Sequence, residues 1–313
     1  MPSTTAKKHG KAAHRGQQPA VRRRWRPRWP LLIPATIAWL GLLIFMYPST
    51  ASWVSQYNQS QLIGSYSAQV EEGLDPAAPQ QLEQARKYNE ALNSGALLGA
   101  NTNLPTGEGT SDDESLDYWS MLRAKGADVM ARLRIPAIDV DLPIYHGTSD
   151  ATLDMGVGHL EGTSLPVGGA GTHSVLTAHR GLAHATMFSN LDQVKVGDTF
   201  SIEVLGEVLT YRVANTTVVD PDQTESLRQA PGKDLVTLVT CTPLGINTQR
   251  ILVTAERMLP TPQEDLDALG QRPDIPGFPW WTLVIGGGTL TAGTFIWSSG
   301  RVQPARRGGS QPN

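Results

Sequence analysis

Residues 237–250, TLVTCTPLGINTQR, end one β-favouring run and open the next, Ile251-Leu252-Val253. Alternation around Leu238 buries that side chain and places Cys241, the only cysteine of the 313-residue chain, where the first strand ends. The loop then returns the chain like a hairpin and brings Arg250 back near Cys241. This stretch therefore predicts a pair of strands with a thiol and a guanidinium close together.

Short β-type runs continue on both sides of this pair. Beyond Val129 they are separated by Gly, Pro, Asn and Asp, and they cover residues 131–135, 138–145, 174–178, 199–204, 207–219, 235–240 and 250–258. Seven or eight strands in about 130 residues predict a mainly β domain, either a closed barrel or a sandwich. We expect this domain to occupy residues 120–260.

The N-terminal part has the composition of a membrane anchor. Residues 1–29 carry nine Lys and Arg and no acidic residue, and residues 30–48 are uncharged and mostly apolar. A span needs roughly 20 apolar residues, so the second segment is about long enough to cross a bilayer. No convincing cleavage site follows, which favours an uncleaved anchor over a removed signal peptide.

A second apolar run covers residues 280–298, with Trp280-Trp281 at its start and Arg301, Arg306 and Arg307 in the tail 299–313. The positive-inside rule places both basic tails in the cytoplasm and residues 49–279 outside the cell. The alternative is a buried core helix, but Gly286 to Gly288 are unfavourable in a soluble helix. We therefore predict a two-pass membrane protein in contact with lipid.

The exported part is strongly acidic. The two tails contain 12 of the 26 Lys and Arg and none of the 29 Asp and Glu, which leaves 14 basic against 29 acidic residues, a net charge of −15, between them. Phosphate would repel this part, so nucleic acid is not expected as a partner. A single cysteine also excludes an internal disulfide.

Between the first span and the β domain the chain changes character twice. Residues 49–98 are polar and helix-prone, with a break at residues 73–76, and predict two helices. Residues 99–119 have the composition of a loop, and residues 261–279 that of a linker. A loop of roughly twenty residues in a compact domain calls for a functional explanation.

Three side chains are candidates for chemistry. Cys241 is a possible nucleophile, although a lone cysteine is often only a small buried hydrophobe. His179 ends the run 174–178, and Arg250 either stabilises an oxyanion or is an ordinary surface residue. We expect His146, His159, His173 and His184 to be loop or surface histidines. No histidine spacing is typical of a metal site, so neither a metal nor another cofactor is predicted.

Three motifs in order resemble the sortases, specifically the pilus-assembling class C. They are the stretch 237–250 quoted above, Leu176-Thr177-Ala178-His179-Arg180-Gly181, and Gly158-His159-Leu160-Glu161-Gly162-Thr163-Ser164-Leu165-Pro166, and the resemblance covers about residues 131–258. It implies an eight-stranded sortase β-barrel with N-terminal helices and two flanking membrane helices.

The resemblance also implies a reaction. Cys241 attacks the threonyl carbonyl of an LPxTG-type sorting signal on a pilin or surface protein, His179 serves as acid and base, and Arg250 holds the substrate and the oxyanion. A lysine amine of another pilin accepts the acyl group. Thr177 and Thr240, beside this pair, are expected to contact the substrate.

Class C sortases commonly cover the cysteine with a lid built on an Asp-Pro-aromatic motif, which this chain lacks in the corresponding loop. We hypothesise that residues 107–119 form an atypical lid, with Asp112 or Asp113 and the ring of Tyr118 or Trp119 over Cys241. The alternative is a disordered linker.

Two other functions stay open. A housekeeping sortase would use the same three residues to attach proteins to cell-wall peptide. A membrane-tethered β-barrel binding module would not need the thiol at all.

Overall fold

The computed structural model describes residues 25, 29–71, 77–92, 97–98, 105–106, 116–123, 128–223 and 225–301. The chain forms two units, which we describe separately. One is made of Met1–Phe45 and Thr282–Asn313, and the other of Met46–Trp281. Asp112 and Asp113, predicted in the lid, lie outside the described residues.

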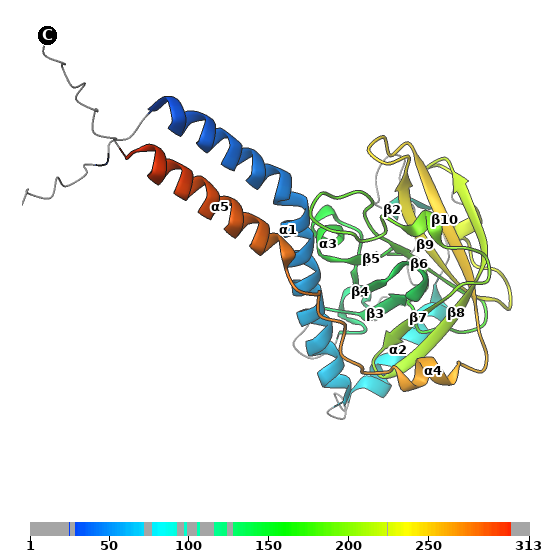
Figure 1. Ribbon diagram of the computed structural model, residues 1–313. Helices are drawn as coiled ribbons and strands as arrows, with labels where there is room; N and C mark the ends of the chain where they lie inside the picture. The colour runs from blue at the N-terminus through cyan, green and yellow to red at the C-terminus, as the bar shows by residue number, and fades with distance from the viewer. Residues whose placement is uncertain are drawn as a thin grey trace, which may run out of the picture. The chain divides into compact units, whose positions relative to one another are not determined.

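The larger unit contains a closed barrel with the strand order β10-β8-β7-β3-β4-β5-β6-β9 (Figure 1). The strands are β3 (Ala131–Ile135), β4 (Val140–His146), β5 (Val157–His159), β6 (Thr172–Thr177), β7 (Thr199–Val204), β8 (Glu207–Val219), β9 (Asp234–Thr242) and β10 (Gln249–Arg257). The prediction of an eight-stranded barrel is confirmed, and each of the seven predicted runs is a strand. Only β5 was missed: it has three residues, with Gly158 in the middle, too few to show alternation.

Register-paired side chains fill the barrel interior. Leu133 on β3 lies opposite Ile202 on β7, which lies opposite Leu209 on β8, and all three are buried. Each such side chain stabilises the fold by roughly 1.5–3 kcal/mol relative to an exposed one. The alternation seen in the sequence thus becomes continuous layers across neighbouring strands.

Two neighbouring strand pairs are parallel, β4 with β5 and β6 with β9. The chain passes from β4 to β5 through helix α3 (Asp150–Met155), which begins after Ser149, whose Oγ accepts a hydrogen bond from the Thr152 N–H. Because parallel strands point the same way, the carboxyl ends of β6 and β9 lie at the same edge of the barrel. Cys241 is the penultimate residue of β9.

Two long helices precede the barrel, α1 (Trp29–Glu71) and α2 (Ala78–Ala91). The helix over the first predicted span therefore continues past residue 48 without a break, and a second helix follows the predicted break at 73–76. Helix α2 packs on the barrel through buried Leu82, Ala85 and Tyr88. Its Asn89 side chain donates to the Leu165 carbonyl over 3.0 Å and accepts from the Leu165 N–H over 2.7 Å.

The region predicted as a loop contains a short antiparallel pair, β1 (Leu97–Leu98) with β2 (Pro105–Thr106), and a 3-10 turn, η1 (Tyr118–Ser120). Short helices elsewhere are η2 (Pro136–Ile138), η3 (Leu191–Gln193), η4 (Glu225–Leu227) and α4 (Gln263–Asp267). They shape the connections between strands and leave the barrel order unchanged.

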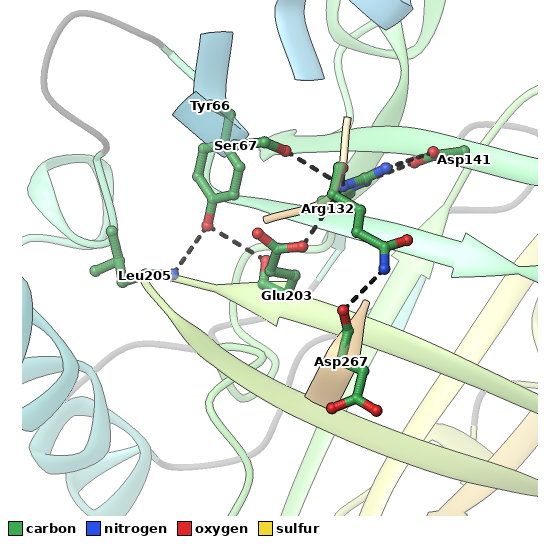
Figure 2. A network of polar contacts seen from close by, with 8 residues as sticks. Tyr66, Ser67, Arg132, Asp141, Glu203, Leu205 and Asp267 are labelled. Carbon is green, nitrogen blue, oxygen red and sulfur yellow. Dashed lines mark hydrogen bonds and ion pairs between the residues drawn. The ribbon is translucent and has the colours of Figure 1, made fainter. Parts of the chain in front are cut away.

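A buried arginine joins three parts of the larger unit. Arg132 of β3 is 1% exposed, pairs with Asp141 of β4 over 2.7 Å and with Glu203 of β7 over 3.6 Å, and donates to Ser67 Oγ of α1 over 3.2 Å (Figure 2). A further hydrogen bond of 2.6 Å runs to the Gln271 carbonyl, beyond α4. One guanidinium therefore binds the barrel, the end of α1 and the segment that follows the barrel.

The smaller unit contains the first part of α1 and most of α5 (Trp280–Ser299). The Trp39 indole donates to Thr289 Oγ1 over 3.0 Å, and a Cβ at Gly288 would overlap Leu42. The glycine thus permits close approach of two helices, as small residues do between membrane helices.

Of the helices in the described ranges, α1 alone is long and apolar enough to cross a membrane. Helix α5 forms where the second span was predicted but does not meet the same measure of apolar character. The second span stays a prediction.

Candidate active site

The ends of β6 and β9 bring His179 alongside Cys241. Thr177 of β6 pairs with Val239 of β9, so His179 follows β6 two residues after this pair, as Cys241 follows Val239 by two residues on β9. Two hydrogen bonds maintain this alignment beyond the end of β6: Ala178 N–H to the Val239 carbonyl, 3.2 Å, and Thr240 Oγ1 to the Ala178 carbonyl, 2.8 Å. The sequence predicted only that each of these two residues lies at the end of a strand. The structure adds that the two strands are neighbours.

Arg250 lies on the other side of Cys241. The antiparallel register of β9 and β10 pairs Arg250 directly with Cys241, as the hairpin interpretation predicted. Arg250 is 3% exposed, and one of its terminal nitrogens donates to the Asn247 and Gln249 carbonyls, each over 3.0 Å. The buried Nε has no hydrogen-bond partner within the described part of the chain. A buried donor without a partner calls for an explanation.

Two influences act on the Cys241 thiol. Burial raises the pKa of Cys241 above its ordinary value, and the positive charge of Arg250 opposes that rise. At neutral pH the thiol is therefore mostly protonated, so it needs a proton acceptor when it reacts. A histidine beside it has the chemistry for that role.

Thr177 and Thr240 hold the strand ends together. Both are almost fully buried, and each hydroxyl donates to a carbonyl of the neighbouring strand: Thr177 to Val239 over 3.2 Å, and Thr240 to Ala178 over 2.8 Å. In this arrangement their hydroxyls position the strand ends. Contact of either residue with substrate stays a prediction.

Tyr118, predicted in the lid, is held by polar contacts with the barrel. Its hydroxyl donates to His159 Nδ1 over 2.9 Å and accepts from the Gly147 N–H over 3.0 Å, so its partners follow β4 and belong to β5. Trp119 is 46% exposed and packs against Gly147 and His146. Tyr118 therefore anchors the end of the loop on β5, and contact of an aromatic residue here with Cys241 stays a prediction.

Three histidines expected on loops or the surface are buried in the barrel. His146, His159 and His173 belong to β4, β5 and β6. Burial lowers the pKa of each, that of His159 to about 4, so His159 stays neutral near pH 7. Its Nε2 donates to the Ser164 carbonyl over 2.9 Å, which fixes Nδ1 as the acceptor for Tyr118.

Sequence reasoning missed Arg180, which follows His179 directly. Its side chain is 11% exposed, pairs with Asp192 over 2.7 Å and donates to Thr242 Oγ1 over 3.1 Å. A basic residue next to a candidate histidine was the available signal. Its partners, 12 and 62 positions away, became evident only in the folded chain.

The edge of the barrel thus carries a thiol, an imidazole and a guanidinium, the parts that acyl transfer needs. In the described ranges no group of three or more His, Cys, Asp and Glu side chains is arranged to hold a metal ion.

Comparison with known proteins identifies the family of this domain. Residues 133–258 match the family described as the sortase domain. The chain is 28% identical over 180 residues to sortase A of Streptococcus agalactiae serotype III (strain NEM316), covering 55% of this chain and 72% of that protein.

Solved structures are more similar in sequence. The crystal structure of sortase C-1 from Actinomyces oris is 50% identical, with a TM-score of 0.52, and the match covers 58% of this chain and 98% of that one. Sortase C2 of pilus island 1 from Group B Streptococcus is 43% identical, with a TM-score of 0.52, over 59% of this chain and 99% of that one. Because nearly the whole of these structures is matched at 43–50% identity, the chain belongs to the sortase family of transpeptidases, within its class C.

Proposed function

We propose that this sortase joins pilin subunits outside the cell, with Cys241 as nucleophile, His179 as acid and base, and Arg250 as the group that holds the oxyanion. The observation that supports this assignment is the register: β9 pairs Cys241 with Arg250 on one side, and on the other side the parallel strand β6 leads directly into the segment that begins with Ala178 and His179. Cys241 is the one cysteine of the chain, so the nucleophilic thiol can only be this residue.

The first half of the reaction cleaves the donor. The Cys241 sulfur attacks the threonyl carbonyl carbon of an LPxTG-type signal while its proton passes to His179. The carbonyl oxygen becomes an oxyanion, and the guanidinium of Arg250, which the register sets opposite Cys241, is a donor suited to it. His179 then gives the proton to the departing glycine amine, the threonyl–glycyl bond breaks, and a thioester on Cys241 remains.

The second half joins the donor to its acceptor. A lysine amine of another pilin attacks the thioester carbonyl and loses a proton to His179. The carbon–sulfur bond breaks, an isopeptide bond has formed, and Cys241 regains its proton from His179. Because water would give hydrolysis at the same step, the amine must be positioned close to the thioester.

The class of acceptor follows from the similarity. The Group B Streptococcus protein is described as a sortase of a pilus island, and this chain is 43% identical to it. This favours a pilin lysine over the short amine of a cell-wall peptide, the acceptor of a housekeeping sortase. We further propose that α1 and α5 both cross the membrane and leave both termini in the cytoplasm, as the basic tails predict.

The test uses the full chain in detergent micelles. A pilin carrying an LPxTG-type signal is incubated with the enzyme, and products are separated by denaturing electrophoresis, where isopeptide-linked polymers persist as a ladder. We expect a ladder with the native chain and none with Cys241→Ala. A short glycyl or diaminopimelate-type amine is added in parallel as the competing acceptor.

Two matched controls accompany the active-site variants. His184→Ala changes another histidine of the loop that carries His179, and Arg212→Gln changes an exposed arginine of the strand beside β10. Both should retain polymerisation, whereas His179→Ala and Arg250→Gln should lose it. Attachment to the short amine without a ladder would instead support the housekeeping function, and an active Cys241→Ala would refute the assignment of the nucleophile.

A further inference from the structure

A direct hydrogen bond joins the two residues that follow the proposed catalytic pair. Arg180 follows His179, Thr242 follows Cys241, and a terminal nitrogen of Arg180 donates to Thr242 Oγ1 over 3.1 Å. The Arg180 side chain is 11% exposed, so this bond forms in a largely dry environment. A charged donor strengthens such a bond relative to a neutral one.

The remaining nitrogens of Arg180 hold the loop that carries His179. Nε donates to the Ser189 carbonyl over 3.1 Å, and the second terminal nitrogen pairs with Asp192 of η3 over 2.7 Å. Ser189 Oγ in turn accepts from the Gly181 N–H over 3.0 Å. Ser189 and Asp192, which lie later in the loop, therefore both contact Arg180, and Ser189 also contacts its neighbour Gly181. The His179 carbonyl accepts a further hydrogen bond from the Phe188 N–H over 3.1 Å.

The same loop makes a second contact beyond Cys241. Gly181 has φ +75°, and a Cβ at this position would lie 2.5 Å from Cδ1 of Leu244, in the loop after Cys241. The Gly181 backbone therefore packs closely on Leu244. Arg180 with Thr242 and Gly181 with Leu244 form two adjacent links from the β6–β7 loop, one to the end of β9 and one to the loop that follows β9.

The positive charges of Arg180 and Arg250 act on different groups. Arg250 is the charge that lowers the pKa of Cys241, whereas Arg180 forms an ion pair with Asp192. Asp192 balances the charge of Arg180, whose guanidinium stays positive and presents its donors in a planar fork. That geometry lets one side chain bind a carbonyl, a carboxylate and a hydroxyl from three separate residues.

We propose that Arg180 is a positioning residue for transpeptidation: through Thr242 it fixes the loop of His179 against the strand end of Cys241. This inference rests on the proposed function, because it takes His179 and Cys241 as the reacting pair. A displacement of about 1 Å between reacting groups can cost roughly 100-fold in rate, so the bond has a catalytic consequence without any contact with substrate.

The experiment measures kcat and KM of the full chain in micelles with an LPxTG-type peptide and a lysine-bearing acceptor. Thr242→Val removes the hydroxyl at nearly constant shape and should lower kcat about tenfold, the loss expected for one hydrogen bond to a charged group, with KM nearly unchanged. Thr242→Ser restores the hydroxyl and should recover most of that loss. Arg180→Met should lower kcat at least as much.

A double variant tests the coupling. If the two side chains act through one bond, Arg180→Met with Thr242→Val lowers kcat no further than Arg180→Met alone. Arg86→Met is the matched control, because Arg86 pairs with Glu207 over 2.7 Å at the far end of the barrel, near the start of β9. It should leave kcat and KM unchanged.

The pH profile of Cys241 alkylation separates positioning from loss of structure. We expect Arg180→Met and Thr242→Val to shift the pH dependence of the alkylation rate in the same direction as His179→Ala does, but by a smaller amount. Arg86→Met should leave this pH dependence unchanged. Additive losses, or no recovery in Thr242→Ser, would overturn the role of Arg180. Loss of activity in Cys241→Ala and His179→Ala with full activity in Arg180→Met would refute this inference alone, whereas activity in Cys241→Ala would refute the proposed function itself.

Discussion

At the scale of single residues, Cys241 is subject to two opposing influences. Burial raises the pKa of its thiol and Arg250 lowers it, so the reactivity of Cys241 depends on a neighbour nine positions away in the chain. That neighbour is paired with it across two strands. The sequence indicated this pairing because a hairpin returns a residue at a fixed spacing.

Arg250→Gln should therefore have two measurable effects. Without the positive charge the pKa of Cys241 rises further, the thiolate fraction at pH 7 falls, and alkylation by iodoacetamide slows. The alkylation profile moves toward higher pH as a result. We also expect transpeptidation to fall by roughly 100- to 1,000-fold, the usual cost of removing one oxyanion donor.

The control for this prediction is Arg212→Gln, an exposed arginine on β8 that should leave both measurements unchanged. Faster alkylation in Arg250→Gln would show that the charge does not favour the thiolate. An unchanged alkylation profile with lost transpeptidation would assign Arg250 to the oxyanion alone.

At the scale of elements, the strands and the loops were not equally predictable. Seven strands were located by alternation and β-favouring residues because a barrel wall is half buried along its length. Strand β5 could not be, since its three residues become a strand only through bonds to β4 and β6. The contact of Tyr118 with His159 could not be predicted for a similar reason, because His159 belongs to that unpredicted strand.

The buried Arg132 cluster links elements whose association has no local signal. Arg132→Met leaves Glu203 buried without its compensating charge, and breaking a buried pair in this way costs about 3–5 kcal/mol of unfolding free energy. Arg86→Met removes the half-exposed pair with Glu207 and should cost at most about 1 kcal/mol. Denaturant unfolding of the full chain in micelles measures both.

Hydrogen exchange provides a local measurement for the same cluster. In Arg132→Met the backbone amides near Ser67 and Gln271 should exchange faster, because both segments lose their bond to the guanidinium. If Arg132→Met does not fold, Arg132→Lys is used instead. It keeps the positive charge, so any faster exchange then measures the loss of the guanidinium hydrogen bonds alone. Equal stability losses in Arg132→Met and Arg86→Met would contradict the role given to the cluster.

At the scale of the whole molecule, the lone cysteine is also a reporter of topology. If residues 49–279 are exported, a membrane-impermeant maleimide should label Cys241 on intact cells. In a Cys241→Ala background, Ser310→Cys places the thiol in the C-terminal tail, where labelling should require permeabilised cells. We expect this protection because the tails carry basic residues, and positively charged segments are retained on the cytoplasmic side of the membrane.

Labelling of Ser310→Cys on intact cells would show that α5 does not cross the membrane, and the proposal of two spans would then be withdrawn. Absence of Cys241 labelling has two readings, which urea distinguishes: a buried thiol becomes reactive on unfolding, whereas a cytoplasmic one stays protected while the membrane is intact. Cys241→Ala without a new cysteine serves as the blank.

The sequence by itself determined seven of the eight barrel strands, the basic tails, the first apolar segment and the return of Arg250 toward Cys241. These properties depend on local composition and on spacing within about a dozen residues. The tertiary structure decided that β6 lies parallel to β9, and with it that His179 lies beside Cys241 and Arg180 binds Thr242, 62 positions away. Parallel pairing of distant strands is fixed by closure of the barrel, where every strand must find two hydrogen-bonding neighbours, and no local pattern records which neighbours those are.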